Sequence, residues 1–218
     1  MELKGTKINF LGDSITAGDG SSALSKSFPA VIEREYGAVC RNYGICGSCI
    51  ARRKEIDSTI TSHRDFVMRV DDMEPDADVV VVFGGTNDFG HGDAPIGTMD
   101  DRTPYTFYGA LHCLYIALIK KYPAKLIVIL TPTHRYNEDN PHGDNKTTSV
   151  ATLIEYVNII REVAEYYSLP VYDLFKESGF QTRVPEVQQM LMPDGLHPSD
   201  MGYEVLAHKV AQYLKTHI

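Results

Sequence analysis

The most constraining feature of this chain is a continuous apolar run, Val79-Val-Val-Val82, inside the predicted strand Ala77–Phe83. The run lacks the alternation of a strand with one face in water, so both faces of its sheet must be covered. Other short β-rich runs alternate along the chain with longer stretches of helical period. This pattern predicts βαβ units and an α/β fold built on a parallel sheet.

The expected strands are short and rich in β-branched or aromatic residues: Lys7–Leu11, Ala38–Asn42, Ala77–Phe83, Lys125–Leu130 and Leu169–Tyr172. The expected helices have amphipathic spacing: Phe28–Tyr36, one opening after Gly47, Thr103–Lys121, Val150–Tyr167 capped by Thr148 or Ser149, and Asp200–Lys215. We expect the strand order 2-1-3-4-5, with helices on both faces. A length of 218 residues suits one domain spanning residues 1–218.

The composition argues against several classes of function. A formal charge of -8 disfavours nucleic acids and anionic membranes, which both select basic patches. The longest apolar runs, Val79–Phe83 and Leu126–Leu130, are too short to span a bilayer. The N-terminus leads directly into the first strand, so we expect no signal peptide and a cytoplasmic protein. In that compartment the four cysteines should be reduced thiols.

Ser14 lies in a turn after the first predicted strand, at the strand end where α/β sheets bind their ligands. A helix that follows such a turn offers N–H groups to a developing oxyanion. A serine hydroxyl becomes an effective nucleophile only when a base takes its proton. Serine at this place can also serve only as a helix cap or a phosphate ligand, and the segment alone leaves these alternatives open.

Asp194 and His197 can supply that base. Their spacing lets the carboxylate reach the Nδ1–H of the imidazole, which leaves Nε2 to face a serine. Asn87 follows two glycines after the buried strand, and its amide can donate to an oxyanion, although an asparagine here can also simply cap a turn. In the strand order 2-1-3-4-5 the first and third strands flank the point where the order reverses, so Ser14 and Asn87 should meet there.

Four blocks of the chain resemble the SGNH hydrolases, also called the GDSL esterase/lipase family. They are Gly12-Asp-Ser-Ile-Thr-Ala-Gly18, Asn42-Tyr-Gly-Ile-Cys-Gly47, Gly84-Gly-Thr-Asn-Asp88 and Asp194-Gly-Leu-His-Pro198. The Gly-x-Ser-x-Gly elbow of ordinary α/β-hydrolases is absent around Ser14. The resemblance spans nearly the whole chain and implies a flavodoxin-like three-layer sandwich.

The resemblance also implies a role for each matching residue. Ser14 would be the nucleophile, His197 its base, and Asp194 the carboxylate that orients the base. The oxyanion would be held by the N–H groups of Ser14 and Gly47 and by the side chain of Asn87. Such an enzyme hydrolyses carboxylic esters through an acyl-enzyme, and it needs neither a cofactor nor a metal ion.

Cys46 departs from the family pattern, in which serine is common at this position. Together with Cys49 it forms a Cys-x-x-Cys after a predicted strand, which is the setting of a thiol oxidoreductase. That alternative leaves Ser14, Asn87 and the Asp194–His197 pair without a role. A single Cys-x-x-Cys is also weak support for a zinc site. A binding module without catalytic activity is disfavoured because every matching catalytic position is filled.

Two polar segments, His91–Asp101 and His134–Asn145, interrupt the pattern. Their histidines, His91, His134 and His142, could form a metal site, but we expect them to be solvated. The polar side chains of such segments can hydrogen-bond the hydroxyl groups of a substrate, but they are poorly suited to burying an acyl chain. We therefore expect a short-chain, acetyl-type esterase acting on a small-molecule ester of a polar or carbohydrate alcohol. A lysophospholipase or thioesterase acting on longer acyl chains is the alternative.

Overall fold

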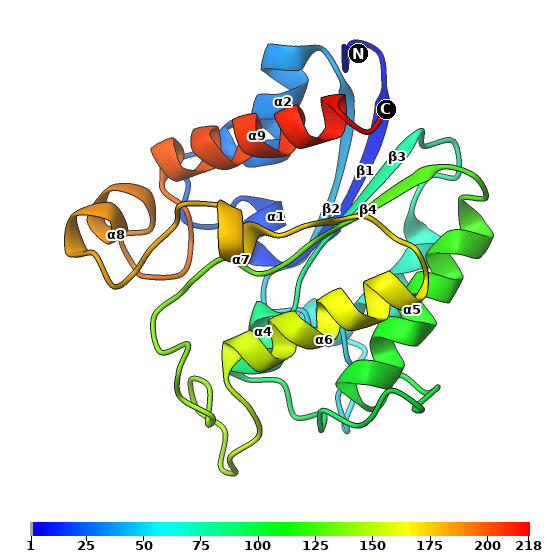
Figure 1. Cartoon of the computed structure of the whole chain (residues 1–218), viewed down its shortest axis with the longest axis vertical. Coiled ribbons are helices and arrows are strands. Elements are labelled where there is room, and N and C mark those ends of the chain that lie inside the picture. The colour runs from blue at the N-terminus through cyan, green and yellow to red at the C-terminus, as the bar shows by residue number, and fades with distance from the viewer. Residues whose placement is uncertain (1) are drawn as a thin grey trace.

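The computed structural model describes residues 2–218, and its centre is one five-stranded parallel sheet (Figure 1). The strands lie in the order β2-β1-β3-β4-β5, which confirms the predicted order. Their bounds are β1 Lys7–Gly12, β2 Val39–Gly44, β3 Val79–Phe83, β4 Leu126–Leu130 and β5 Val171–Tyr172. The order reverses between β1 and β3, so the ends of these two strands flank the switch point.

Helices cover both faces of the sheet. The α-helices are α1 Ser14–Ala17, α2 Phe28–Tyr36, α3 Phe66–Arg69, α4 Thr86–Gly90, α5 Phe107–Lys121, α6 Leu153–Tyr166, α7 Leu174–Glu177, α8 Pro185–Leu191 and α9 Asp200–Lys215. Short 3₁₀ turns are η1 Leu24–Lys26, η2 Thr61–His63 and η3 Val70–Asp72. Within residues 2–218, no helix has the length and apolar character needed to cross a membrane.

The side chains of Val79–Val82 pack into two apolar layers, one on each face of the sheet. Val79 and Val81 pack in the layer that contains Phe28 of α2 and Leu206 of α9. The alternate residues Val80 and Val82 pack in the opposite layer, with residues of α5 and α6. Figure 1 shows the pair α2 and α9 on one side of the sheet and the pair α5 and α6 on the other. This arrangement confirms the three-layer sandwich.

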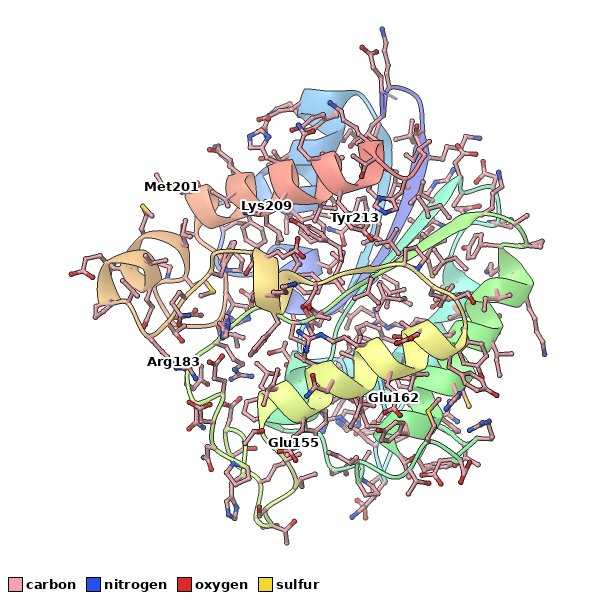
Figure 2. All side chains as sticks on the ribbon, viewed as in Figure 1. Glu155, Glu162, Arg183, Met201, Lys209 and Tyr213 are labelled. Carbon is pink, nitrogen blue, oxygen red and sulfur yellow. The ribbon has the colours of Figure 1, made fainter. Side chains whose placement is uncertain are left out.

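The bounds of α9 agree with the sequence prediction, whereas α6 begins later than predicted. Ser199 caps α9 by accepting a hydrogen bond from the Gly202 N–H at 3.1 Å. In α6 the cap is Thr152, not Thr148 or Ser149, because Thr152 and Glu155 form a reciprocal capping box. Glu155 is labelled at that end of α6 in Figure 2.

Further bounds differ from the predictions: β1 ends at Gly12 rather than Leu11, and β3 and β4 begin at Val79 and Leu126 rather than at Ala77 and Lys125. Helix α5 begins at Phe107 rather than Thr103, because Thr106 caps it by accepting from the Gly109 N–H. Strand β2 runs two residues further, to Gly44, and β5 is reduced to Val171–Tyr172. The short helices α1, α3, α4, α7 and α8 were not predicted. Of these, α1 and α4 matter most, since they follow β1 and β3 at the switch point.

The helix expected after Gly47 does not form. Residues 45–60 contain neither helix nor strand, because several of their backbone N–H groups bond outside the segment. The Asp88 carboxylate accepts the N–H groups of Ile50 at 2.9 Å and Ala51 at 2.8 Å, and the Arg52 N–H donates to the Pro104 carbonyl. A helix would need those donors for its own ladder.

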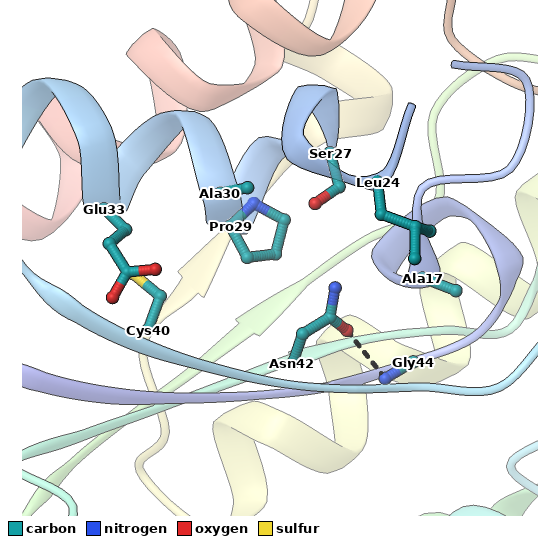
Figure 3. Close-up of a pocket in the computed structure, with 9 residues that line it drawn as sticks. All are labelled: Ala17, Leu24, Ser27, Pro29, Ala30, Glu33, Cys40, Asn42 and Gly44. Carbon is teal, nitrogen blue, oxygen red and sulfur yellow. Dashed lines mark hydrogen bonds between the residues drawn. The ribbon is translucent and has the colours of Figure 1, made fainter. Parts of the chain in front are cut away.

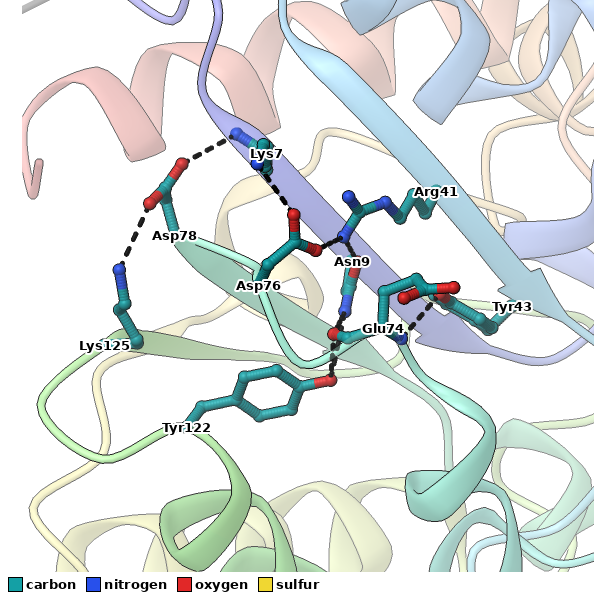
Figure 4. A network of polar contacts seen from close by, with 9 residues as sticks. All are labelled: Lys7, Asn9, Arg41, Tyr43, Glu74, Asp76, Asp78, Tyr122 and Lys125. Atoms are coloured by element: carbon teal, nitrogen blue, oxygen red, sulfur yellow. Dashed lines mark hydrogen bonds and ion pairs between the residues drawn. The ribbon is translucent and has the colours of Figure 1, made fainter.

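The amino ends of the strands carry a separate polar network (Figure 4). Asp76 pairs with Lys7 at 2.7 Å and with Arg41 at 2.6 Å. Beneath this pair, Asn9 is fully buried and donates to the Glu74 carbonyl at 2.8 Å and to the Tyr122 hydroxyl at 3.0 Å. The opposite, carboxyl ends of the strands are therefore the ones left for a ligand.

Candidate active site

Ser14 begins α1 directly after β1. The turn is held by Asp13, whose Oδ1 accepts the Ile15 N–H at 3.0 Å and so caps the helix. Gly12 is required before it, since a Cβ there would approach the Phe83 carbonyl oxygen to 2.9 Å. The sequence thus forces a tight strand-to-helix turn that places Ser14 at the switch point.

Asp194 and His197 lie in the segment between α8 and α9. One carboxylate oxygen of Asp194 accepts the N–H groups of Leu196 at 2.8 Å and His197 at 2.7 Å, which closes the turn. The other oxygen lies 2.7 Å from Nδ1 of His197. Burial alone would raise the pKa of Asp194, but these hydrogen bonds from His197 and Leu196 hold it below its ordinary value.

The imidazole of His197 joins the two distant segments. Its Nε2 lies 2.9 Å from the Ser14 hydroxyl oxygen, although 183 residues separate the two in sequence. With Asp194 on Nδ1, the three side chains form one continuous hydrogen-bonded chain. The structure thus brings together the three residues that the sequence singled out as nucleophile, base and orienting acid.

A hydrogen bond joins Asn87 to the loop that carries Gly47. Asn87 is buried in α4 directly after β3, and its Nδ2 donates to the Ser48 carbonyl at 3.0 Å. Gly47 has a φ of +74°, a left-handed conformation that favours glycine. Within residues 2–218, no hydrogen-bond acceptor meets the backbone N–H of Ser14 or of Gly47.

Comparison with known proteins agrees with this geometry. The family model of the GDSL-like lipase/acylhydrolase family matches residues 10–205. The chain belongs to this family. The family's members hydrolyse esters, so the chain is an ester hydrolase of the serine-dependent type. Among curated proteins, no match to the chain is found.

Solved structures show the same fold along the whole chain. One crystal structure has 34% sequence identity and a TM-score of 0.84, with 99% of each chain covered. A protein from Lactobacillus plantarum has 27% identity and a TM-score of 0.84 over the full length of both chains. A lipase/acylhydrolase from Enterococcus faecalis has 24% identity and a TM-score of 0.68, covering 97% of this chain and 96% of its own.

Arg69 of α3 supports this GDSL-family site and was not predicted. Its guanidinium is buried and donates to the Tyr43 carbonyl at 2.7 Å, the Gly12 carbonyl at 3.0 Å and the Ser48 hydroxyl at 2.9 Å. It therefore ties the ends of β1 and β2 to the loop that Asn87 also holds. The sequence did contain a signal for this role, because an arginine inside the apolar stretch Phe66–Val70 indicates a buried cation.

Two buried carboxylates stand beside the same site. Burial raises the pKa of Asp13 to about 7, against the lowering effect of the Ile15 N–H and of the charges on His197 and Arg69. Burial likewise raises the pKa of Asp88 to about 6, although two backbone N–H groups donate to it. Both carboxylates have a structural role, because each one holds in place a turn that carries a site residue.

The polar segment 134–145 links two sides of the site. The guanidinium of Arg135 is buried; it donates to the Thr86 carbonyl next to Asn87 and pairs with Asp144 at 2.7 Å. The Tyr136 N–H donates to the Gly195 carbonyl at 2.8 Å, within the Asp194–His197 turn. Further out, Arg183, labelled in Figure 2, pairs with Glu138 and Asp139 at 2.7 and 2.8 Å.

The cysteines do not have the character of a redox pair. All four are free thiols. Burial raises the pKa of Cys49 well above its ordinary value, and burial and nearby carboxylates also raise the pKa of Cys46. A thiol oxidoreductase needs the opposite, a pKa lowered toward the thiolate.

The expectation of three solvated histidines is wrong for two of them. His91 is half-buried against Arg53 at 3.1 Å, and His134 stacks on Phe175 and contacts Glu138. His142 is exposed. Within residues 2–218, no three side chains of histidine, cysteine, aspartate or glutamate are gathered in a way that could hold a metal ion.

Proposed function

We propose that this GDSL-family chain is a serine-dependent esterase that removes short acyl groups, acetyl in particular, from a polar or carbohydrate alcohol. The observation that carries the proposal is the continuous chain of hydrogen bonds from Asp194 through His197 to Ser14, at 2.7 and 2.9 Å. Such a chain orients the imidazole and removes the serine proton as the hydroxyl attacks.

In the first half of the reaction, Ser14 Oγ attacks the ester carbonyl carbon while Nε2 of His197 takes the hydroxyl proton. The carbonyl oxygen becomes an oxyanion. The N–H groups of Ser14 and Gly47 and the Nδ2 of Asn87 are the proposed donors to it, and the first two have no other acceptor among residues 2–218. When the tetrahedral intermediate collapses, the ester C–O bond breaks and the alcohol leaves with the proton from Nε2.

In the second half, the imidazole takes a proton from a water molecule as that water attacks the acyl-serine. The second tetrahedral intermediate uses the same donors and releases the acid. Ser14 recovers its proton from Nε2. Asp194 stays ionised throughout, and its depressed pKa fits this role because a carboxylate is needed to stabilise the imidazolium.

The surroundings of the site support a polar alcohol. The segment 134–145, rich in polar side chains, lies against the Asp194–His197 turn through the Tyr136–Gly195 hydrogen bond. The Asp19 carboxylate lies 3.7 Å from Nε2 of His197. A pocket for a long acyl chain would instead be lined mainly by apolar groups.

The proposal is tested with p-nitrophenyl esters of rising acyl length and with Ser14→Ala. The wild type should hydrolyse the acetyl ester best. Ser14→Ala should lose turnover and fluorophosphonate labelling while its thermal unfolding stays that of a folded protein. Turnover that persists in Ser14→Ala would contradict the assignment of the nucleophile. A kcat/KM that rises steadily to octanoyl would instead favour a lysophospholipase or thioesterase.

A further inference from the structure

Asp19 stands beside the proposed base. Its Oδ1 accepts the N–H of Gly20 at 3.1 Å, and its Oδ2 faces Nε2 of His197. The backbone is fixed, since the Asp19 N–H donates to the Ser14 carbonyl at 2.9 Å and the buried Tyr203 hydroxyl donates to the Asp19 carbonyl at 2.7 Å. The side chain is 54% exposed, and His197 is its only ion-pair partner among residues 2–218. An exposed carboxylate on such a rigid turn is available to a ligand.

The turn that follows Asp19 holds its carboxylate close to the imidazole of His197. Gly20 has a φ of +86°, and a Cβ at this position would lie 2.6 Å from Cβ of His197. Only glycine lets the chain pass this close to the base. As a result Oδ2 of Asp19 lies 3.7 Å from Nε2 of His197, the nitrogen that also meets Ser14.

The same turn lines a cavity of about 340 Å³. It is lined by residues 17–21, 23 and 24, including Asp19, and by Cys46, which precedes Gly47. The cavity therefore lies beside Asp19 and beside the residue that precedes a proposed oxyanion donor. Through Ala17 and Leu24, which line both, it adjoins a second cavity of about 410 Å³, shown in Figure 3 with Ser27 and Asn42 at its wall.

We infer that this cavity is the subsite for the leaving alcohol and that Asp19 determines its specificity for alcohols with a neighbouring hydroxyl. The inference rests on the proposed function. Nε2 of His197 must deliver its proton to the leaving oxygen, so the alcohol lies next to Nε2. Oδ2 of Asp19 is then in reach of a hydroxyl one or two carbons away, and a charge-assisted hydrogen bond forms.

The lining favours a hydroxylated alcohol over a quaternary ammonium. Sites for quaternary ammonium groups are built from aromatic rings, and neither cavity has an aromatic residue in its wall. Besides Leu24, Pro29 and the Glu33 carboxylate, the walls carry hydroxyl and amide side chains, namely Ser21, Ser27 and Asn42. A glycerol or sugar unit matches this chemistry.

The test compares glycerol monoacetate with propyl acetate, which has the same carbon chain and no hydroxyl. We expect the wild type to prefer glycerol monoacetate in kcat/KM. Asp19→Ala should reduce that preference about 10- to 100-fold, the worth of a hydrogen bond to a charged group. Asp19→Asn keeps an acceptor and should reduce it less. Asp100→Asn, which neutralises an exposed carboxylate outside both cavity walls, is the charge control and should leave it unchanged.

Two results would overturn this inference and leave the proposed function standing. If Asp19→Ala slows both esters by the same factor, Asp19 acts only through His197 and does not contact the alcohol. If the wild type prefers acetylcholine and Asp19→Asn abolishes that preference, the subsite is cationic. A different result, no Ser14-dependent hydrolysis of p-nitrophenyl acetate by the wild type, would show that the proposed function itself is wrong, and the inference would fall with it.

Discussion

At the residue scale, Asn87 offers a direct test of the proposed oxyanion site. One of its two Nδ2 protons is bound to the Ser48 carbonyl, which leaves the second for a substrate. Asn87→Ala should lower kcat by roughly 10²–10³, the usual effect of losing one oxyanion donor, with little change in KM. Steady-state kinetics on p-nitrophenyl acetate measure this. A fully active Asn87→Ala enzyme would make Asn87 a turn residue only.

Asp13 should make stability depend on pH. Its pKa is about 7 in the folded protein, because burial disfavours the carboxylate, against an ordinary value of 3.8 in the unfolded chain. Between about pH 3.8 and about pH 7, the folded state therefore binds more protons than the unfolded state. The stabilisation is fully present below about pH 4 and is lost as pH rises through about 7, at a slope of up to about 1.4 kcal/mol per pH unit.

The measurement is urea unfolding from pH 4.5 to 7.5, comparing the wild type with Asp13→Asn. Asparagine keeps an oxygen to accept the Ile15 N–H, so the helix cap survives. The free energy of unfolding of the wild type, relative to the variant, should fall as pH rises. A difference that stays constant with pH would mean that Asp13 is already ionised throughout.

At the scale of the elements, Arg69 aligns the ends of β1 and β2 with the loop that carries Gly47. Arg69→Met keeps the buried stem but leaves three acceptors without their donor. We expect kcat to fall by about 10²-fold, the effect of a displacement near 1 Å in an active site, with a smaller change in KM. The free energy of unfolding should also drop, because buried acceptors lose their partners.

A double-mutant cycle separates positioning from simple destabilisation. Arg69 and Asn87 both bond to Ser48, through its hydroxyl and its carbonyl. If Arg69 acts through this loop, the losses in kcat from Arg69→Met and Asn87→Ala should not add. Arg69→Lys should recover part of the rate. Additive losses would show that Arg69 contributes only to stability.

At the scale of the whole molecule, the polar network around Asn9 and the proposed active site lie at opposite ends of the sheet. Asn9 is buried at the amino end of β1 and holds the Glu74 carbonyl and the Tyr122 hydroxyl (Figure 4). Asn9→Leu should lower the free energy of unfolding by about 1–3 kcal/mol, because those groups lose a partner. Urea unfolding and kcat, measured together, test this. The kcat should stay at the wild-type value, and a drop in kcat would mean that the two ends are coupled.

The sequence by itself determined the elements whose signals are local. The continuous run Val79–Val82 predicted a strand covered on both faces, because each of its positions must be buried. The amphipathic spacing of Asp200–Lys215 predicted the bounds of α9. The Thr152–Glu155 capping box was also present in the sequence and marks the true start of α6, although the helical period alone suggested an earlier one.

Only the tertiary structure decided what depends on contacts between distant segments. The loop after Gly47 is not a helix because the carboxylate of Asp88, 37 residues beyond Ala51, accepts hydrogen bonds from the N–H groups of the loop. Arg69 reaches Gly12, 57 residues away, and Ser14 reaches His197 across 183 residues. Motifs predicted which residues carry the chemistry, but a carboxylate such as Asp19 gains its place beside His197 only when the sheet brings both to the same switch point.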